Sequence, residues 1–132
     1  MAPYSDPDSG DEGHEFIAFL LDQLRNWAPV TARRMFGGHG LFCGGVMFAI
    51  VSDETLFLRT DGENRPAFEA SEMQPFRYLR AGRLVALGYH QAPPDLFDDG
   101  DALVQWSAAA YGAALRMSVP ERRRRQPDRR RR

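Results

Sequence analysis

Three histidines and one cysteine are the side chains of this chain best suited to bind a metal or attack a substrate: His14, His39, His90 and Cys43. They come from separate stretches, and no pair stands at a spacing such as HxxxH, which would place two ligands together. A nucleophilic cysteine also needs a base and an orienting group, which the residues around Cys43 do not mark. We therefore predict no catalytic residue, no metal site and no cofactor. Cys43 is expected to be a small buried apolar side chain.

A glycine-rich run, Gly37-Gly38-His39-Gly40, raises the possibility of an anion site, because such loops can hold phosphate through backbone N–H groups. Phosphate loops normally open a helix, however, whereas this run lies between expected strands and lacks the Gly-Lys-Ser/Thr ending of a P-loop. A tight turn or bulge needs only the positive φ that glycine adopts easily. We predict a structural turn here, with His39 exposed in it.

Four acidic residues near the C-terminal third could suggest calcium: Asp95, Asp98, Asp99 and Asp101. The stretch lacks the glycine and the terminal glutamate of an EF-hand loop. Capping of the helix that follows accounts for these acids. Since no GxSxG elbow or paired carboxylates occur either, we expect a protein that is not an enzyme.

Charge is divided sharply along the chain. Residues 116–132 hold nine Arg against two acids, a net of +7, while the remaining eight Arg face sixteen acids, a net of −8. A block of like charge repels itself, so we expect residues 118–132 to be a disordered tail. The tail could contact nucleic acid, remain solvated, or fold back on the acidic body. The candidate nucleic-acid contacts are Arg122, Arg123, Arg124, Arg125, Arg129, Arg130, Arg131 and Arg132.

The length and composition favour one globular domain. A chain of 132 residues with 43% hydrophobic residues can bury a core, and one cysteine excludes an intramolecular disulfide. There is neither an apolar run long enough to span a membrane nor a signal-peptide pattern. We expect a cytoplasmic protein without membrane contact.

The elements that would position these residues can be placed by their periodicity. Residues 1–13 are expected to be disordered, and apolar residues three and four apart predict a helix from His14 to about Trp27. Residues 33–61 predict a meander of three strands, and a capping box at Thr60 to Glu63 begins a short helix. Strands at 76–79 and 84–89, joined by Arg80-Ala81-Gly82-Arg83, form a hairpin, and a last helix runs from about Ala102 to Met117.

The order helix, three strands, helix, two strands, helix indicates an α+β domain over residues 14–117, with helices against a five-stranded antiparallel sheet. Strand 46–51 is apolar on both faces, with Val46, Phe48 and Ile50 on one and Met47, Ala49 and Val51 on the other. Either helices cover both faces of the sheet, or a second subunit covers one. A homodimer is therefore expected.

These residues also carry a resemblance to a known family. The run Arg34, Met35, Phe36, Gly37, Gly38 and Gly40, followed by Gly45, Phe48-Ala49, Asp53, Leu56, Leu58-Arg59, Phe68, Phe76, Tyr78, Tyr89 and Pro93, resembles the N-terminal domain of the TfoX/Sxy family over residues 14–116. The resemblance implies a small α+β fold similar to secretion-chaperone domains. It also implies a bacterial, non-enzymatic regulator of competence that acts through protein partners in transcription, possible partners including the transcription machinery.

The chain departs from the family pattern at its C-terminal end. Competence regulators of this type carry a second, helical domain, whereas this sequence enters Pro120-Glu121 and the arginine block. The alternative function is an accessory nucleic-acid-binding protein that acts through the arginine-rich tail.

Overall fold

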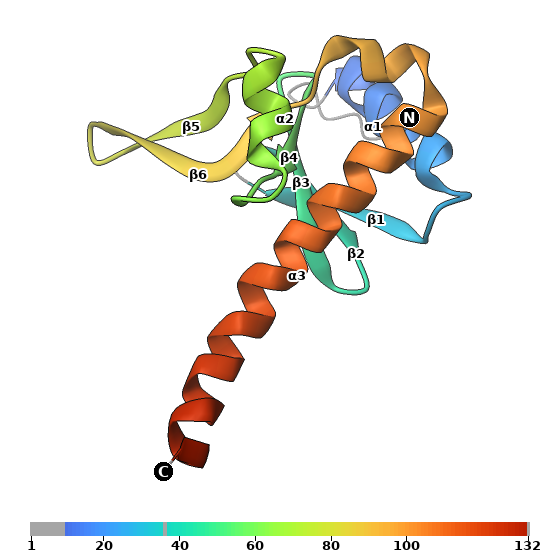
Figure 1. Cartoon of the computed structure of the whole chain (residues 1–132). Coiled ribbons are helices and arrows are strands. Elements are labelled where there is room, and N and C mark those ends of the chain that lie inside the picture. The colour runs from blue at the N-terminus through green and yellow to red at the C-terminus, as the bar shows by residue number, and fades with distance from the viewer. Residues whose placement is uncertain (1–9, 36, 132) are drawn as a thin grey trace.

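A computed structural model of the chain describes residues 10–35 and 37–131, with side chains described over 14–35 and 37–117. Three α-helices, six strands and one 3₁₀ turn follow one another within these residues (Figure 1). They are α1 (Gly10–Leu24), β1 (Val30–Met35), β2 (Gly38–Cys43), β3 (Val46–Ser52), β4 (Thr55–Arg59), α2 (Arg65–Ala70), β5 (Pro75–Arg80), β6 (Arg83–Gln91), η1 (Pro94–Asp98) and α3 (Gly100–Arg131).

The strands form one antiparallel sheet in the order β1-β2-β3-β4-β6-β5, which confirms the predicted α+β class. The sheet has six strands, so the prediction of five is wrong. Four strands, and not three, lie between Val30 and Arg59 because the chain reverses at Gly37 and returns at once along β2. Most of the glycine-rich run therefore belongs to a strand.

A bulge in β3 changes the expected alternation of its side chains. Leu41 pairs with Ala49 and Phe42 with Met47, so Phe48 has no partner on β2. At such a bulge, the side chains of the extra residue and of one neighbour in the strand point to the same face of the sheet. Phe48 is fully buried against Trp27 and Tyr111, with ring centroids 5.6 and 6.4 Å away. It thus lies on the face of Ala49, and the predicted grouping with Ile50 is wrong.

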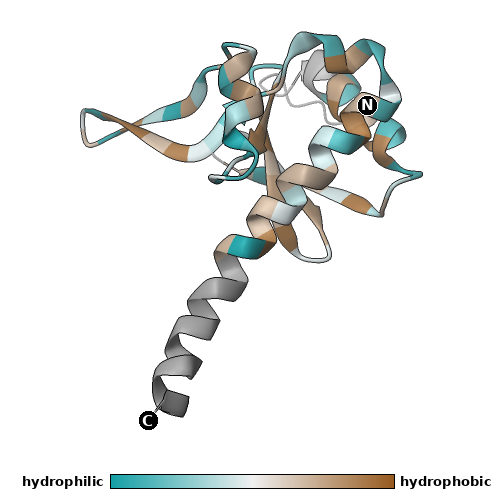
Figure 2. Ribbon diagram, in the orientation of Figure 1, coloured by the Kyte–Doolittle hydropathy of each residue, from teal (hydrophilic) through white to brown (hydrophobic). Residues whose placement is uncertain are grey.

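The helices pack on one face of the sheet. A transverse row of paired residues on this face, Ala32, Leu41, Ala49, Leu58 and His90, faces them. Leu41, Ala49 and Leu58 are fully buried in the same cluster as Leu20 of α1 and Leu103 of α3. Figure 2 shows the hydrophobic colours concentrated along the central strands where α3 crosses them. Burial of these apolar side chains supplies most of the stability of the fold.

The local signals at the helix ends are partly confirmed. Asp99 Oδ1 accepts the N–H of Ala102 at 3.1 Å, so capping does account for this member of the acidic cluster. Pro66 lies in the first turn of α2, as expected. The capping box at Thr60 and Glu63 is wrong, because the Thr60 hydroxyl bonds His90 Nδ1 at 3.0 Å instead.

Asp61 organises the entry to α2 in place of that box. Its Oδ1 accepts the N–H groups of Glu63 and Asn64 at 3.0 and 3.3 Å, and its own N–H donates to Asn64 Oδ1 at 2.8 Å. Arg116 of α3 donates to both carboxylate oxygens of Asp61, from Nε at 2.6 Å and from Nη2 at 3.1 Å. This bidentate pair ties α3 to the loop between β4 and α2.

Two helices extend past the domain predicted over residues 14–117, whose boundaries stay a prediction. The backbone of α1 begins at Gly10, within the segment predicted to be disordered, and that of α3 continues to Arg131 through the predicted tail. A disordered segment was expected over 1–13; residues 1–9 lie outside the described part of the chain.

The β5–β6 hairpin is confirmed, and its two-residue turn is Ala81-Gly82. Both residues have positive φ, 54° and 80°, as a two-residue hairpin turn that matches the strand twist requires. The hairpin projects away from the helices and is the part of the sheet farthest from α3 in Figure 1.

Candidate functional site

The side of the sheet opposite the helices, which we call the open face, is defined by a second transverse row. Arg33, Gly40, Ile50, Phe57 and Gln91 are paired in succession across five strands, and paired residues in antiparallel strands share a face. This row is shifted by one residue from the row that faces the helices, so its side chains point the other way.

Apolar side chains meet at the β1–β3 end of the open face. A Cβ added at Gly40 would lie 2.6 Å from Met47 Sδ, 2.8 Å from Met35 Sδ and 3.1 Å from Phe42 Cε1. These side chains therefore converge over Gly40, next to Ile50, which is 1% exposed. Met35, Phe42 and Met47 are each only partly covered. The open face thus has apolar character without the large core of the helix side.

Two arginines of the open face lie over aromatic rings. The Arg33 guanidinium carbon is 4.8 Å from the centroid of Phe42, and that of Arg59 is 5.2 Å from the centroid of Tyr89. Arg59 Nη1 also donates to the Leu87 carbonyl at 3.1 Å. Burial raises the pKa of Tyr89, and Arg59 partly opposes that rise. Both guanidinium groups are held in place by the rings beneath them.

Three half-buried rings continue the open face across β4 and β5. The Phe57 and Phe76 centroids are 4.8 Å apart in an edge-to-face contact. Phe76 and Tyr78, two residues apart on β5, lie nearly parallel at 6.4 Å, with 21° between their planes. The rings thus form a short row that ends on the projecting hairpin.

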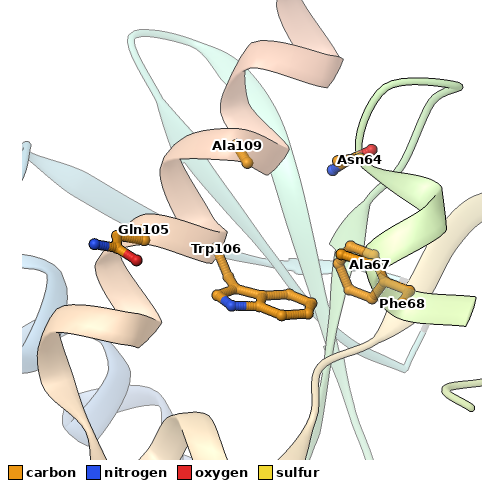
Figure 3. Close-up of a pocket in the computed structure, with 6 residues that line it drawn as sticks. All are labelled: Asn64, Ala67, Phe68, Gln105, Trp106 and Ala109. Atoms are coloured by element: carbon orange, nitrogen blue, oxygen red, sulfur yellow. The ribbon is translucent and has the colours of Figure 1, made fainter. Parts of the chain in front are cut away.

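A cavity of about 260 Å³ lies on the helix side, between α2 and α3. Its lining is mainly apolar and consists of Asn64, Ala67, Phe68, Gln105, Trp106 and Ala109 (Figure 3). The indole of Trp106 reaches from α3 toward the Phe68 ring, with centroids 4.9 Å apart. Asn64 uses its amide within the loop, donating to the Arg59 carbonyl at 2.9 Å. The cavity offers contact area and few polar groups for chemistry.

The histidines and the cysteine do not form a common site. His14 and His39 are neighbours, with ring centroids 6.5 Å apart, whereas His90 lies against Phe68. Cys43 is buried, as predicted. His39 is half-buried in β2, so its expected place in an exposed turn is wrong, and burial lowers its pKa, with further lowering from Arg34 and His14. Over residues whose side chains are described, no three potential metal ligands gather.

The residues of the family-like motif are spread over two strands and two turns. Arg34 and Met35 lie in β1, Gly38 and Gly40 in β2, Gly37 in the turn between them, and Gly45 in the turn before β3. Phe36 lies outside the described residues. The absence of a side chain at Gly38 has a clear steric reason, because a Cβ at this position would clash with the Val51 carbonyl oxygen. Gly38 thus allows the close approach of β2 and β3.

The predicted contacts in the tail cannot be placed as side chains. The backbone of residues 122–125 and 129–131 belongs to α3, while their side chains and residue 132 lie outside the described part of the structure. Nucleic-acid contact through the tail stays a prediction. No described helix is both long and apolar enough to cross a membrane.

Sequence reasoning missed the open face as a candidate site. Its residues come from five strands that are distant in sequence, and only the register brings Arg33, Phe57 and Gln91 into one row. Alternation of aromatic residues and arginine along single strands, as in Phe57-x-Arg59 and Phe76-x-Tyr78-x-Arg80, was the available signal.

Comparison with known proteins agrees with the family resemblance of the sequence. The model of the TfoX N-terminal domain family matches residues 22–114. A 57-residue stretch is 35% identical to the DNA transformation protein TfoX1 of Aliivibrio fischeri (strain ATCC 700601 / ES114). That stretch covers 43% of this chain and 27% of the length of the relative. On the family match, the chain belongs to the TfoX N-terminal domain family.

Proposed function

We propose that this chain is a non-enzymatic regulatory domain that binds a partner protein through the tip of its β5–β6 hairpin. Membership of the TfoX N-terminal domain family supports a competence-related role, and the similar protein of Aliivibrio fischeri is named for DNA transformation. Control of transcription in the cytoplasm, through a protein contact, is the setting we propose for that role.

The observation that carries the proposal is an exposed leucine pair on the hairpin. Leu79 and Leu84 are directly opposite each other on β5 and β6, and 69% and 67% of their surfaces are exposed. Among the described residues, Met117 is the next large exposed apolar side chain, at 48%. Two adjacent leucines on a projecting element provide a compact apolar contact that a partner can bury.

The charge of the hairpin favours a particular kind of partner. Residues 75–91 include three arginines and no Asp or Glu, and Arg77 shares the face of Leu79 because it lies two residues before it on β5. A complementary partner presents an apolar surface bordered by carboxylates. A second copy is less suited at this edge, because pairing of two β5 strands would bring these arginines together. The predicted homodimer is therefore an alternative outcome of the test.

A photo-crosslinking amino acid at position 79 tests the proposal in the native host, with position 117 as the matched exposed apolar control. We expect a discrete crosslinked protein from position 79 and none from position 117. The double substitution Leu79→Ser and Leu84→Ser should abolish capture by a crosslinker placed at position 86, which is exposed and lies on the same side of the hairpin as the leucines, while Met117→Ser should not.

Two results would contradict the hairpin as the contact site. One is the same crosslinked proteins from positions 79 and 117. The other is unchanged capture by the double-serine variant, with circular dichroism showing that it is folded. Sedimentation velocity of the purified chain distinguishes a homodimer from a contact with a different protein.

A further inference from the structure

The charged residues of the described fold are divided between the sheet and its connections. The six strands contain Arg33, Arg34, Arg59, Arg77, Arg80 and Arg83 and no Asp or Glu. The acids of the described residues lie in the helices and in the loops and turns that join the elements. The sheet therefore carries positive charge only, although the body of the chain is acidic overall.

Four of these arginines lie on the open face. Arg33 and Arg59 are held over the Phe42 and Tyr89 rings, at 4.8 and 5.2 Å. Arg80 is two residues beyond Tyr78 on the same strand and is paired with Arg83, so both share the Tyr78 face. Guanidinium groups that lie over a ring, as those of Arg33 and Arg59 do, bind phosphate well because their planar donors are already oriented.

Aromatic rings lie between these arginines. Phe57, Phe76 and Tyr78 form the half-buried row described above, and the nearly parallel planes of Phe76 and Tyr78 turn flat apolar surface in a common direction. A flat π-surface beside fixed cations matches a nucleobase beside its phosphate. An acidic peptide would match the arginines but would have no planar group for the rings.

We infer that the open face binds single-stranded nucleic acid, with bases stacked on Phe76 and Tyr78 and phosphates held by Arg33, Arg59, Arg80 and Arg83. A duplex hides the flat faces of its bases within its own stack, so it can use only the arginines. Stacking does not distinguish one base from another, and the site is therefore sequence-tolerant. This site is distinct from the leucine pair of the hairpin and from the arginine-rich tail.

Fluorescence anisotropy of the full chain with labelled 12-nucleotide oligo-dT and oligo-U tests the inference, with a 12-base-pair duplex for comparison. Tyr78→Ala should weaken binding of the single strand about tenfold, as expected for loss of one stacked base. Tyr78→Phe, which keeps the ring, should bind within twofold of the parent chain. The oligo-dT and oligo-U arms separate DNA from RNA as the preferred strand.

The arginines are tested by the dependence on salt. Arg33→Gln should reduce the slope of log affinity against log salt by about 0.7, the value for one phosphate contact on a single strand. Arg65→Gln is the matched control, because it removes the same charge from an exposed position on α2, on the helix side. Its slope should equal that of the parent chain.

Crosslinking separates the open face from the tail. Oligonucleotides that carry 5-bromouracil should crosslink under ultraviolet light to the peptide that contains Phe76 and Tyr78. Crosslinks confined to residues 118–132 would overturn the inference. So would equal affinities of Tyr78→Ala and the parent chain, or equal salt slopes of Arg33→Gln and the parent chain. Arg33 is exposed, so its variant remains informative if Tyr78→Ala fails to fold.

Discussion

The ion pair between Asp61 and Arg116 should make a measurable and pH-dependent contribution to stability. The hydrogen bonds from Arg116 are the main cause that lowers the pKa of Asp61 from 3.8 to about 2, helped by the N–H groups of Glu63 and Asn64. One unit of pKa corresponds to about 1.4 kcal/mol, so the shift corresponds to about 2.5 kcal/mol at pH 7. Because the Arg116 side chain is 39% exposed, we expect about 1 kcal/mol from the pair itself.

The sign of the pH dependence follows from the direction of the shift. Above about pH 5 the carboxylate is charged in both the folded and the unfolded chain, and the full contribution is present. As the pH falls from about 5 toward 2, the unfolded chain takes up a proton that the folded chain does not, and stability is lost. At pH 3 about half of the contribution should remain.

Asp61→Asn is the perturbation, because it removes the charge and keeps an oxygen that can accept the loop N–H groups. At pH 7 it should lower the unfolding temperature by about 5 °C, which corresponds to about 1 kcal/mol for a domain of this size. Asp22→Asn is the control, since the Asp22–Arg25 pair is exposed on both sides and should contribute less than about 0.5 kcal/mol.

Urea denaturation of the parent chain and both variants, at pH 7 and pH 3, measures these differences. The difference between the parent chain and Asp61→Asn should shrink at pH 3. A difference that is the same at both pH values, or an equal loss in Asp22→Asn, would refute the assignment of the pKa shift to Arg116.

Three further substitutions test other parts of the fold. Gly38→Ala should destabilise the domain by about 1–3 kcal/mol, because the new Cβ meets a carbonyl of β3. Gly62→Ala is the control and should change the free energy of unfolding little, because no atom lies within 4 Å of the added Cβ. Chemical denaturation compares the two variants. Ser107→Ala should stabilise the domain by about 1 kcal/mol in the same assay, because the buried hydroxyl has no hydrogen-bond partner among the described residues. Burial lowers the pKa of His90, and the charges of Arg65 and Arg77 lower it further, whereas Glu69 raises it. The free energy of unfolding should therefore fall as the pH drops below 6.5, where the unfolded chain binds a proton more readily than the folded chain. His90→Gln should reduce that fall, measured by thermal melts from pH 7 to pH 5.

Local sequence signals were enough for several elements. The hairpin turn at Ala81-Gly82, the Asp99 cap of α3 and the apolar stripe of α1 each depend on residues a few positions apart. Such signals express the backbone preferences of the residues themselves, so they hold in most tertiary contexts. They were sufficient for the α+β class and for four of the strands.

Other features depend on tertiary pairing, which sequence periodicity does not contain. One strand of the meander was missed because Gly38, His39 and Gly40, which were expected in a turn, belong to β2, and glycine gives little local signal for a strand. The bulge at Phe48 reverses the expected face of one core aromatic residue. Asp61 and Arg116 are 55 residues apart, and no local pattern links them.

The two proposed surfaces can operate together because of the alternation along β5. Leu79 and Leu84 face one side of the hairpin, whereas Tyr78, Arg80 and Arg83 face the other. A protein that covers the leucines would leave the Tyr78 ring accessible, so partner binding and strand binding need not compete.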